Sequence, residues 1–131
     1  FHAMRGSGAY IGSDRIYTNE SIDNKKALAI LVPPHRHHEL IDAYMAKMRK
    51  FYDHFSDMRS LGSAACSICY VAAGRVGVYY EEYLALYDMA AGIVILKEAG
   101  GECFIRKTSD YRIDLLAGSK KAYEATLDIV K

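Results

Sequence analysis

Residues 59–101 read RSLGSAACSICYVAAGRVGVYYEEYLALYDMAAGIVILKEAGG, and the rest of the chain is interpreted around these residues. Small and apolar residues over 63–73 and 87–99, each run followed by glycine, predict two helices. The β-branched and aromatic residues of 75–80 predict a strand between them. Because the second helix is apolar nearly all round, it is expected to be buried between layers. The stretch therefore predicts a helix–strand–helix unit.

Strands and helices also alternate on either side of this unit. Residues 27–32 form an apolar run that ends at Pro33–Pro34, which is typical of an interior strand. Apolar residues at helical spacing predict a helix over 35–51. Further strands are expected at 52–58, 101–105 and 113–117, and an amphipathic helix at 119–131. This alternation predicts an α/β layered sandwich.

The first 26 residues differ from the rest of the chain. Glycine-containing breaks divide residues 1–19 into two short apolar patches, which predicts a β-hairpin. A polar loop over 20–26 then leads into the apolar strand. The chain begins at Phe1 rather than Met, inside an expected strand. Residues 1–26 are therefore interpreted as a hairpin remnant of an upstream sheet, and residues 27–131 as the α/β domain.

Composition narrows the classes of function. A chain of 131 residues with 51% hydrophobic and 25% charged residues is typical of one globular domain. Lys and Arg number 17 against 16 Asp and Glu, so no strong attraction to nucleic acid or an anionic membrane is expected. No apolar run approaches the ~20 residues of a membrane span. Three cysteines, an odd number, argue against a disulfide framework and favour a reducing cytoplasm.

Three groups in the central stretch have side chains or amides suited to binding. Gly62, Ser63 and Ala64 precede a helix of small residues, whose first N–H groups suit an anion. Asp88 opens the next helix, where the dipole keeps a carboxylate ionised, as a hard cation such as Mg²⁺ requires. Glu81 and its neighbour follow the strand and face opposite ways, so one of them can bind sugar hydroxyls in a cleft. Each group taken singly has a commoner explanation, a helix N-cap or a solvated loop.

Five short motifs occur in a fixed order. They are Arg–Ser–Leu–Gly–Ser–Ala–Ala at 59–65, Val–Ala–Ala–Gly–Arg at 71–75, Tyr–Tyr–Glu at 79–81, Tyr–Asp–Met–Ala–Ala–Gly at 87–92 and Glu–Ala–Gly–Gly at 98–101. In order and spacing they resemble the C-terminal half of the inositol monophosphatase family, whose members are Mg²⁺-dependent, lithium-sensitive phosphomonoesterases. The resemblance implies the C-terminal α/β portion of the sugar-phosphatase fold.

By position, the resemblance implies roles for five residues. Asp88 matches a ligand of the family's second catalytic metal. Gly62, Ser63 and Ala64 match the turn that lines the substrate site near the phosphate. Glu81 lies seven residues before Asp88, as in the family, and so matches the acid that binds substrate hydroxyls. No residue of the chain is assigned as catalytic.

The chain also departs from the family pattern. Tyr87 replaces the usual Trp, and Gly77 stands where an Asp is common. The family's first metal-binding glutamate and its Asp-Pro-x-Asp-Gly-Thr motif have no counterpart in these residues. Because one carboxylate, Asp88, cannot hold the array of metal ions that the resemblance implies, the isolated chain is expected to be inactive. The full-length protein is expected to hydrolyse inositol monophosphate or a related sugar phosphate, and to form homo-oligomers such as a dimer.

Alternative interpretations stay open. A fructose-1,6-bisphosphatase or a nucleotide 3′-phosphatase of the same superfamily would share these motifs. A phosphatase-like half could also serve as a non-catalytic interaction or regulatory module. His35, His37 and His38, with Arg36, could bind a metal, but a solvated loop is the commoner explanation because adjacent residues rarely converge on one ion.

Overall fold

Five strands form the central sheet of the computed structural model, which describes all 131 residues. They are β4 (Leu28–Val32), β5 (Asp57–Arg59), β6 (Val78–Ala85), β7 (Glu102–Ser109) and β8 (Arg112–Gly118). Their order in the sheet is β5–β4–β6–β8–β7. Strand β4 runs parallel to β5 and β6, whereas β8 runs antiparallel to β6 and β7. The interior strand predicted at 27–32 is confirmed, since β4 is paired on both sides.

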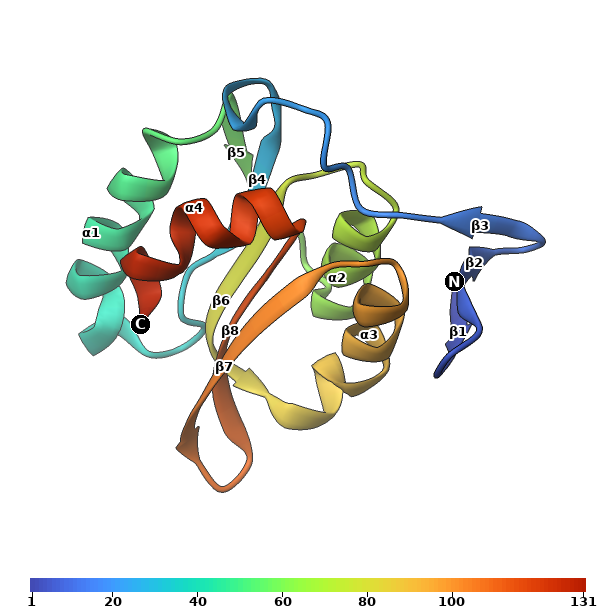
Figure 1. The fold of residues 1–131 in the computed structure, drawn as a ribbon. Coiled ribbons are helices and arrows are strands. Elements are labelled where there is room, and N and C mark those ends of the chain that lie inside the picture. The colour runs from blue at the N-terminus through green and yellow to red at the C-terminus, as the bar shows by residue number, and fades with distance from the viewer.

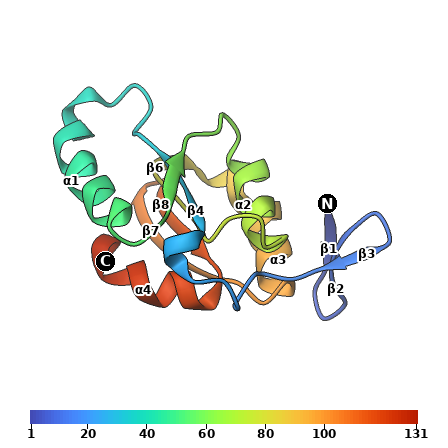
Figure 2. The same ribbon diagram turned by 90° about the horizontal axis from the view of Figure 1, so that it is seen from above.

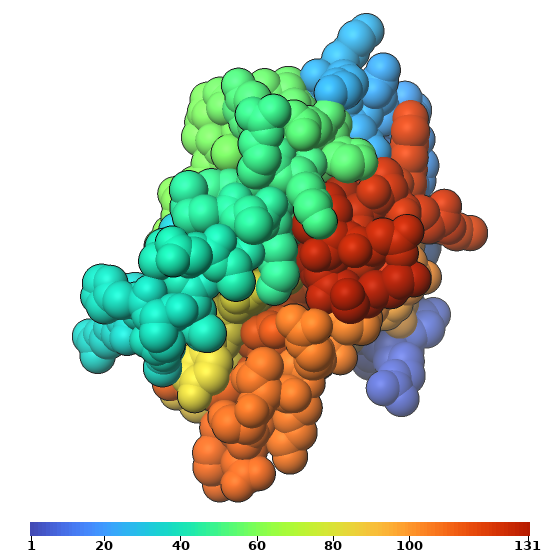
Figure 3. Space-filling view, turned by 90° about the vertical axis from the view of Figure 1, so that its left-hand side faces the viewer, coloured from blue at the N-terminus to red at the C-terminus, as the bar shows by residue number.

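Two helices cover each face of this sheet (Figures 1 and 2). They are α1 (Ile41–Tyr52), α2 (Ala64–Ala72), α3 (Leu86–Glu98) and α4 (Lys120–Val130), with short 3₁₀ helices at Asn24–Lys26 and His38–Leu40. Helices α1 and α4 lie side by side on one face (Figure 3), and α2 and α3 lie on the other. The predicted α/β layered sandwich is therefore confirmed. None of the helices combines the length and apolar content that crossing a membrane requires.

Strand β6 supplies side chains to two separate cores. Neighbouring side chains of a strand point to opposite faces. Tyr79 and Leu84 are buried in the core beneath α2 and α3, whereas Val78 and Tyr80 are buried in the core beneath α1 and α4. The helix–strand–helix unit of residues 59–101 thus lies at the centre of the fold.

The N-terminal residues form a second, smaller sheet rather than the single hairpin predicted. Strands β1 (His2–Met4), β2 (Gly8–Ile11) and β3 (Asp14–Ile16) pair antiparallel in sequence order, with one tight turn after β1 and another after β2. The sheet projects from the α3 side of the molecule (Figure 1). The Glu98 carboxylate at the end of α3 accepts the N–H groups of Gly6 and Gly8 at 2.8 and 2.9 Å, which fixes the sheet to the helix. The domain boundary at residue 26 stays a prediction.

Helix α1 begins later than the predicted residue 35. Arg36 has φ 62°, a left-handed backbone conformation that a right-handed helix cannot contain. A 3₁₀ turn follows, and α1 starts at Ile41 without a capping side chain. The apolar spacing of this segment therefore predicts the helix correctly but not its start.

Helix α3 lies in an outer layer, so the prediction that it is buried between layers is wrong. Its inward stripe contains Met89, Gly92 and Leu96, which are buried. On the outward side Leu86, Tyr87 and Val94 are 44%, 76% and 40% exposed. Strands β1 and β2 also contact α3, but they leave these three side chains exposed.

Candidate functional site

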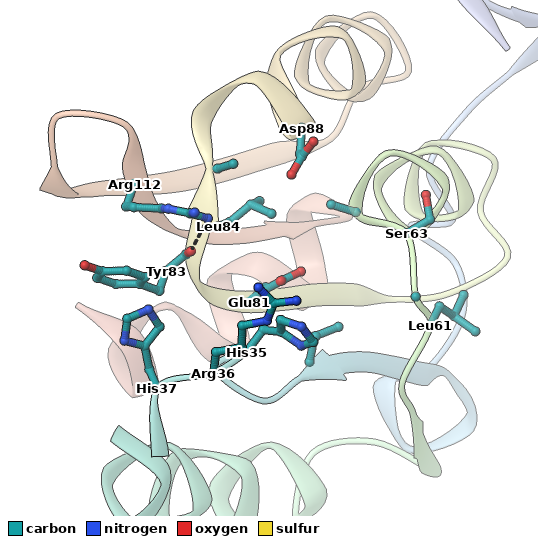
Figure 4. Close-up of a pocket in the computed structure, with 14 residues that line it drawn as sticks. His35, Arg36, His37, Leu61, Ser63, Glu81, Tyr83, Leu84, Asp88 and Arg112 are labelled. Carbon is teal, nitrogen blue, oxygen red and sulfur yellow. Dashed lines mark hydrogen bonds between the residues drawn. The ribbon is translucent and has the colours of Figure 1, made fainter. Parts of the chain in front are cut away.

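A cavity of about 420 Å³ opens on the α2/α3 face of the sheet (Figure 4). It lies beyond the carboxyl ends of β4 and β5, beside β6 and the first turns of α2 and α3. Ligands of α/β proteins commonly bind at the carboxyl ends of parallel strands. The residues lining it include all five predicted site residues, namely Gly62, Ser63, Ala64, Glu81 and Asp88.

The Gly62–Ala64 turn forms one side of the cavity and also begins α2. Ser63 is the N-cap residue: its backbone is extended, and its Oγ accepts the N–H of Cys66 at 3.2 Å. A Cβ added at Gly62 would meet no atom within 4 Å, so this side of the turn is open. The N-cap interpretation of the turn is confirmed. The turn also lines the cavity, and its role in binding an anion stays a prediction.

Glu81 lies inside β6, not after a strand that ends at Tyr80 as predicted. Its backbone is paired with Val32 of β4 and with β8, and its side chain reaches the cavity. The Tyr79 hydroxyl donates a hydrogen bond to the carboxylate. Burial raises the pKa of Glu81, and the negative charge of Asp88 raises it further against the opposing effects of Tyr79 and His35. A ligand that donates hydrogen bonds or carries positive charge would relieve this unfavourable environment.

Glu82 points to the opposite face of the sheet, as the strand alternation requires. Its carboxylate accepts hydrogen bonds from the Tyr80 hydroxyl, at 2.5 Å, and from the Lys47 ammonium group. The expectation that only one of the two glutamates reaches the cleft is confirmed. Family spacing and strand geometry therefore select the same residue, Glu81.

Asp88 is the third residue of α3, not its first as predicted. The N-cap position is Ala85, which makes no side-chain capping bond. Asp88 is exposed at the cavity and takes part in none of the side-chain hydrogen bonds or ion pairs of the chain. Its carboxylate is therefore not committed to the N-cap role that was the commoner explanation.

A β-bulge shapes the wall next to Glu81. The pairing of β6 with β8 shifts register between Glu81 and Leu84, and Tyr83 has φ 60°. Asp114 of β8 accepts the Tyr83 N–H at 3.1 Å and is itself paired with Arg106 at 2.6 Å. Strand β6 continues to Ala85 through the bulge, and the sequence neighbours Tyr83 and Leu84 both line the cavity.

Four basic residues line the same cavity and were not assigned to it from the sequence: His35, Arg36, His37 and Arg112. The ring centroid of His37 lies 4.0 Å from that of Tyr83. The Arg112 guanidinium carbon lies 5.7 Å from the Tyr83 ring centroid. A basic loop directly after an interior parallel strand was a usable signal for the first three. Arg112 offered no such signal, because it reaches the cavity through the bulge.

The residues present do not complete a magnesium site. Asp88 and Glu81 supply the oxygen donors that Mg²⁺ prefers, but its near-octahedral shell requires more ligands. No group of three or more His, Cys, Asp or Glu side chains lies close enough together to hold a metal ion. The chain therefore supplies at most part of such a site.

Comparison with known proteins places these features in a family. The model of the inositol monophosphatase family matches residues 1–128. Nus factor SuhB of Pasteurella multocida is 40% identical over 105 residues, which are 77% of this chain and 38% of that protein. The fructose-1,6-bisphosphatase/inositol-1-monophosphatase of Aquifex aeolicus is 31% identical over 131 residues, the whole of this chain and 50% of that protein.

Solved structures agree with the sequence comparisons. The staphylococcal protein SaIMPase-II with bound inositol monophosphate is 26% identical and superimposes with a TM-score of 0.78. The match covers 98% of this chain and 51% of that one. The chain thus spans between about two-fifths and one half of the relatives that it matches.

Proposed function

This chain belongs to the inositol monophosphatase family, and from that premise we propose that the full-length protein is a Mg²⁺-dependent phosphomonoesterase of inositol monophosphate or a related sugar phosphate. One observation carries the proposal. The five residues singled out by the family motifs come from three separate segments, the turn before α2, strand β6 and the first turn of α3, and they line a single cavity. The bound inositol monophosphate in SaIMPase-II supports the substrate class.

Each part of the cavity has a proposed role in binding. The Gly62–Ala64 turn lies near the phosphate, where backbone N–H groups at the start of α2 attract an anion. The Glu81 carboxylate accepts hydrogen bonds from substrate hydroxyls, held in place by Tyr79. Asp88 contributes one oxygen to Mg²⁺. The remaining metal ligands and the groups that activate water come from outside these residues, so we propose no activity for the isolated chain.

Phosphate release tests the proposal. The isolated chain and the full-length protein are each incubated with inositol 1-phosphate and Mg²⁺, with and without lithium. We expect lithium-sensitive turnover by the full-length protein and none by the isolated chain. Lithium-sensitive turnover by the isolated chain would contradict the proposed division of the site. If the full-length protein hydrolyses no sugar phosphate and no nucleotide phosphate, the proposed phosphatase function is wrong.

A second candidate is a non-catalytic interaction module. The outward apolar side chains of α3, Leu86, Tyr87 and Val94, give a surface that a partner could cover. The Pasteurella relative carries the name Nus factor rather than that of an enzyme. A full-length protein that lacks the Asp-Pro-x-Asp-Gly-Thr motif and phosphatase activity would favour this candidate.

Substrate choice and assembly complete the proposal. The double name of the Aquifex relative supports keeping fructose 1,6-bisphosphate beside inositol 1-phosphate as a test substrate, and a nucleotide 3′-phosphate completes the set.

We also propose a homo-oligomer, because β1 and β3 present unpaired strand edges. A stable monomer in light scattering at high concentration would contradict the proposed homo-oligomer. The three free cysteines support a cytoplasmic location.

A further inference from the structure

We infer that Tyr83 is a specificity-determining residue, whose ring limits the alcohol part of the ester to a single ring and disfavours nucleotides. The inference rests on the proposed function, since it assigns the phosphate to the Gly62–Ala64 turn and the substrate hydroxyls to Glu81. In Figure 4, Glu81 lies between Ser63 on one side of the cavity and Tyr83 on the other. An alcohol bound at Glu81 therefore meets Tyr83 on the side away from the phosphate.

Tyr83 borders two cavities. It is the one residue that lines both the α2/α3 cavity and a second cavity of about 290 Å³, which opens beside Ala43 and Lys47 of α1 and Glu82 of β6. Shortening the side chain at position 83 is expected to join the two spaces. A larger alcohol, such as a nucleoside with its base, then gains room beyond Glu81.

The backbone conformation of Tyr83 does not call for a tyrosine. Its φ of 60° is left-handed, a conformation that glycine adopts freely and asparagine tolerates. The β-bulge requires this backbone but not a side chain of this size. A large residue in such a conformation is costly, and residues of this kind cluster at functional sites. The tyrosine is therefore explained by what its side chain does at the cavity.

The ring of Tyr83 also contributes to neither hydrophobic core. Tyr79 and Tyr80 of the same strand are buried in the cores beneath α2/α3 and α1/α4, whereas Tyr83 belongs to neither. Loss of the ring is therefore expected to leave the packing of the domain intact.

Neighbouring residues hold Tyr83 in place from both its backbone and its ring. The Tyr83 N–H donates a hydrogen bond to Asp114 at 3.1 Å, and the Tyr83 carbonyl accepts one from Arg112 Nη1 at 3.3 Å. The His37 ring centroid lies 4.0 Å from that of Tyr83, and the Arg112 guanidinium carbon lies 5.7 Å from it. In Figure 4 the Tyr83 ring lies between these two basic side chains. The ring is therefore expected to stay in place when a ligand enters.

Turnover by the full-length protein tests the inference. The specificity constant kcat/KM is measured for inositol 1-phosphate and for adenosine 3′-monophosphate, and the ratio of the two values gives the selectivity. The unmodified protein is expected to favour the inositol ester. Tyr83→Gly and Tyr83→Asn, which remove the ring and suit the left-handed backbone, are expected to lower the ratio about tenfold. Tyr83→Phe keeps the ring and is expected to keep the ratio.

Controls separate the ring from general effects. Tyr111→Gly removes a tyrosine ring that is 72% exposed outside the cavity, and it is expected to keep the ratio. Thermal melting of each variant is expected to stay cooperative.

The outcomes are distinct. An unchanged ratio in Tyr83→Gly and Tyr83→Asn, or an unmodified protein that hydrolyses the nucleotide as well as the inositol ester, would overturn the inference and leave the proposed function standing. The inference is also wrong if both variants lose their melting transition, because the ring then supports the fold. Turnover of neither ester by the unmodified protein would count against both the inference and the proposed function.

Discussion

The two faces of β6 use similar residues in opposite ways. On the α1/α4 face, Glu82 is buried and accepts hydrogen bonds from Lys47 and Tyr80, and Asp114 is paired with Arg106 at 2.6 Å. On the α2/α3 face, Glu81 has one internal donor, the Tyr79 hydroxyl. Its cavity neighbours Asp88, Arg36 and Arg112 take part in no ion pair.

The difference separates structural charges from those available to a ligand. Buried charged groups in stable structures are satisfied by internal partners, as Glu82 and Asp114 are on the α1/α4 face. Charged groups that lie around a cavity without such partners are candidates for binding. The comparison predicts that mutations on the α2/α3 face change binding and turnover, whereas mutations on the α1/α4 face change stability.

The largest effect is expected for Asp88→Asn in the full-length protein. Losing the oxygen that we propose binds Mg²⁺, while keeping the side-chain size, should lower kcat about a hundredfold or more. Thermal stability should fall only slightly, since Asp88 makes no internal hydrogen bond and its charge at the start of α3 contributes under about 1 kcal/mol. Asp128→Asn, an exposed aspartate on α4, is the control and should keep normal turnover. If Asp88→Asn keeps the turnover of the unmodified protein, Asp88 has no role in the active site.

Lys47→Met should produce the largest loss of stability. It leaves the buried Glu82 carboxylate without its cation, which we expect to lower the free energy of unfolding by about 3 kcal/mol. Urea unfolding measures this, with exposed Lys50→Met as the control. Affinity for inositol 1-phosphate should not change. A loss under about 1 kcal/mol would show that the pair on the α1/α4 face is not structural.

Two glycines offer a matched steric comparison. A Cβ at Gly77 would lie 2.9 Å from Phe55 Cε1 and 3.3 Å from the Ala27 Cβ, so Gly77→Ala should lower the unfolding free energy by about 1–3 kcal/mol. The same crowding explains why this chain has glycine where the resembled family commonly has Asp. Gly62→Ala meets open space and should change stability by less than about 0.5 kcal/mol. Equal losses of unfolding free energy in Gly77→Ala and Gly62→Ala, measured by urea unfolding, would contradict this steric explanation.

The smallest effect is expected from the pH dependence of Glu81→Gln. The pKa of Glu81 is raised above 4.5, first by burial, so the folded state holds its proton more strongly than the unfolded state. Ionisation therefore costs stability, and this cost appears as pH rises from the unfolded pKa through the folded one. Glu81→Gln should be slightly more stable at neutral pH and equal to the unmodified chain well below pH 4.5. Urea midpoints of the variant and of the unmodified chain are measured across pH. A variant that is less stable than the unmodified chain at neutral pH would show that the folded state stabilises the Glu81 carboxylate, contrary to this prediction.

Much of the fold follows from local signals in the sequence. The apolar run of β4 predicts an interior strand, and Gly74 and Gly100, both with positive φ, end α2 and α3 as their positions predict. The candidate site follows from the order of the motifs, because spacing places Glu81 and Asp88 beside one cavity. Their binding roles stay predictions until they are tested.

Other features depend on tertiary contacts that no local pattern encodes. The β6 bulge depends on Asp114, 31 residues after Tyr83, accepting a single N–H. Because no local pattern predicts the bulge, the strand expected from the sequence ends at Tyr80 and nothing links Arg112 to the site. The exposed side of α3 is another case, since apolar residues all round a helix do not show which stripe the sheet will bury.

A direct comparison of neighbouring variants, Glu81→Gln and Glu82→Gln, tests the central claim. Affinity for inositol 1-phosphate is measured by calorimetry on both, alongside their urea unfolding. We expect Glu81→Gln to weaken binding about tenfold with little loss of stability, and Glu82→Gln to lower stability and leave affinity unchanged. Weaker binding in Glu82→Gln with none in Glu81→Gln would contradict the assignment of the substrate site to the α2/α3 face.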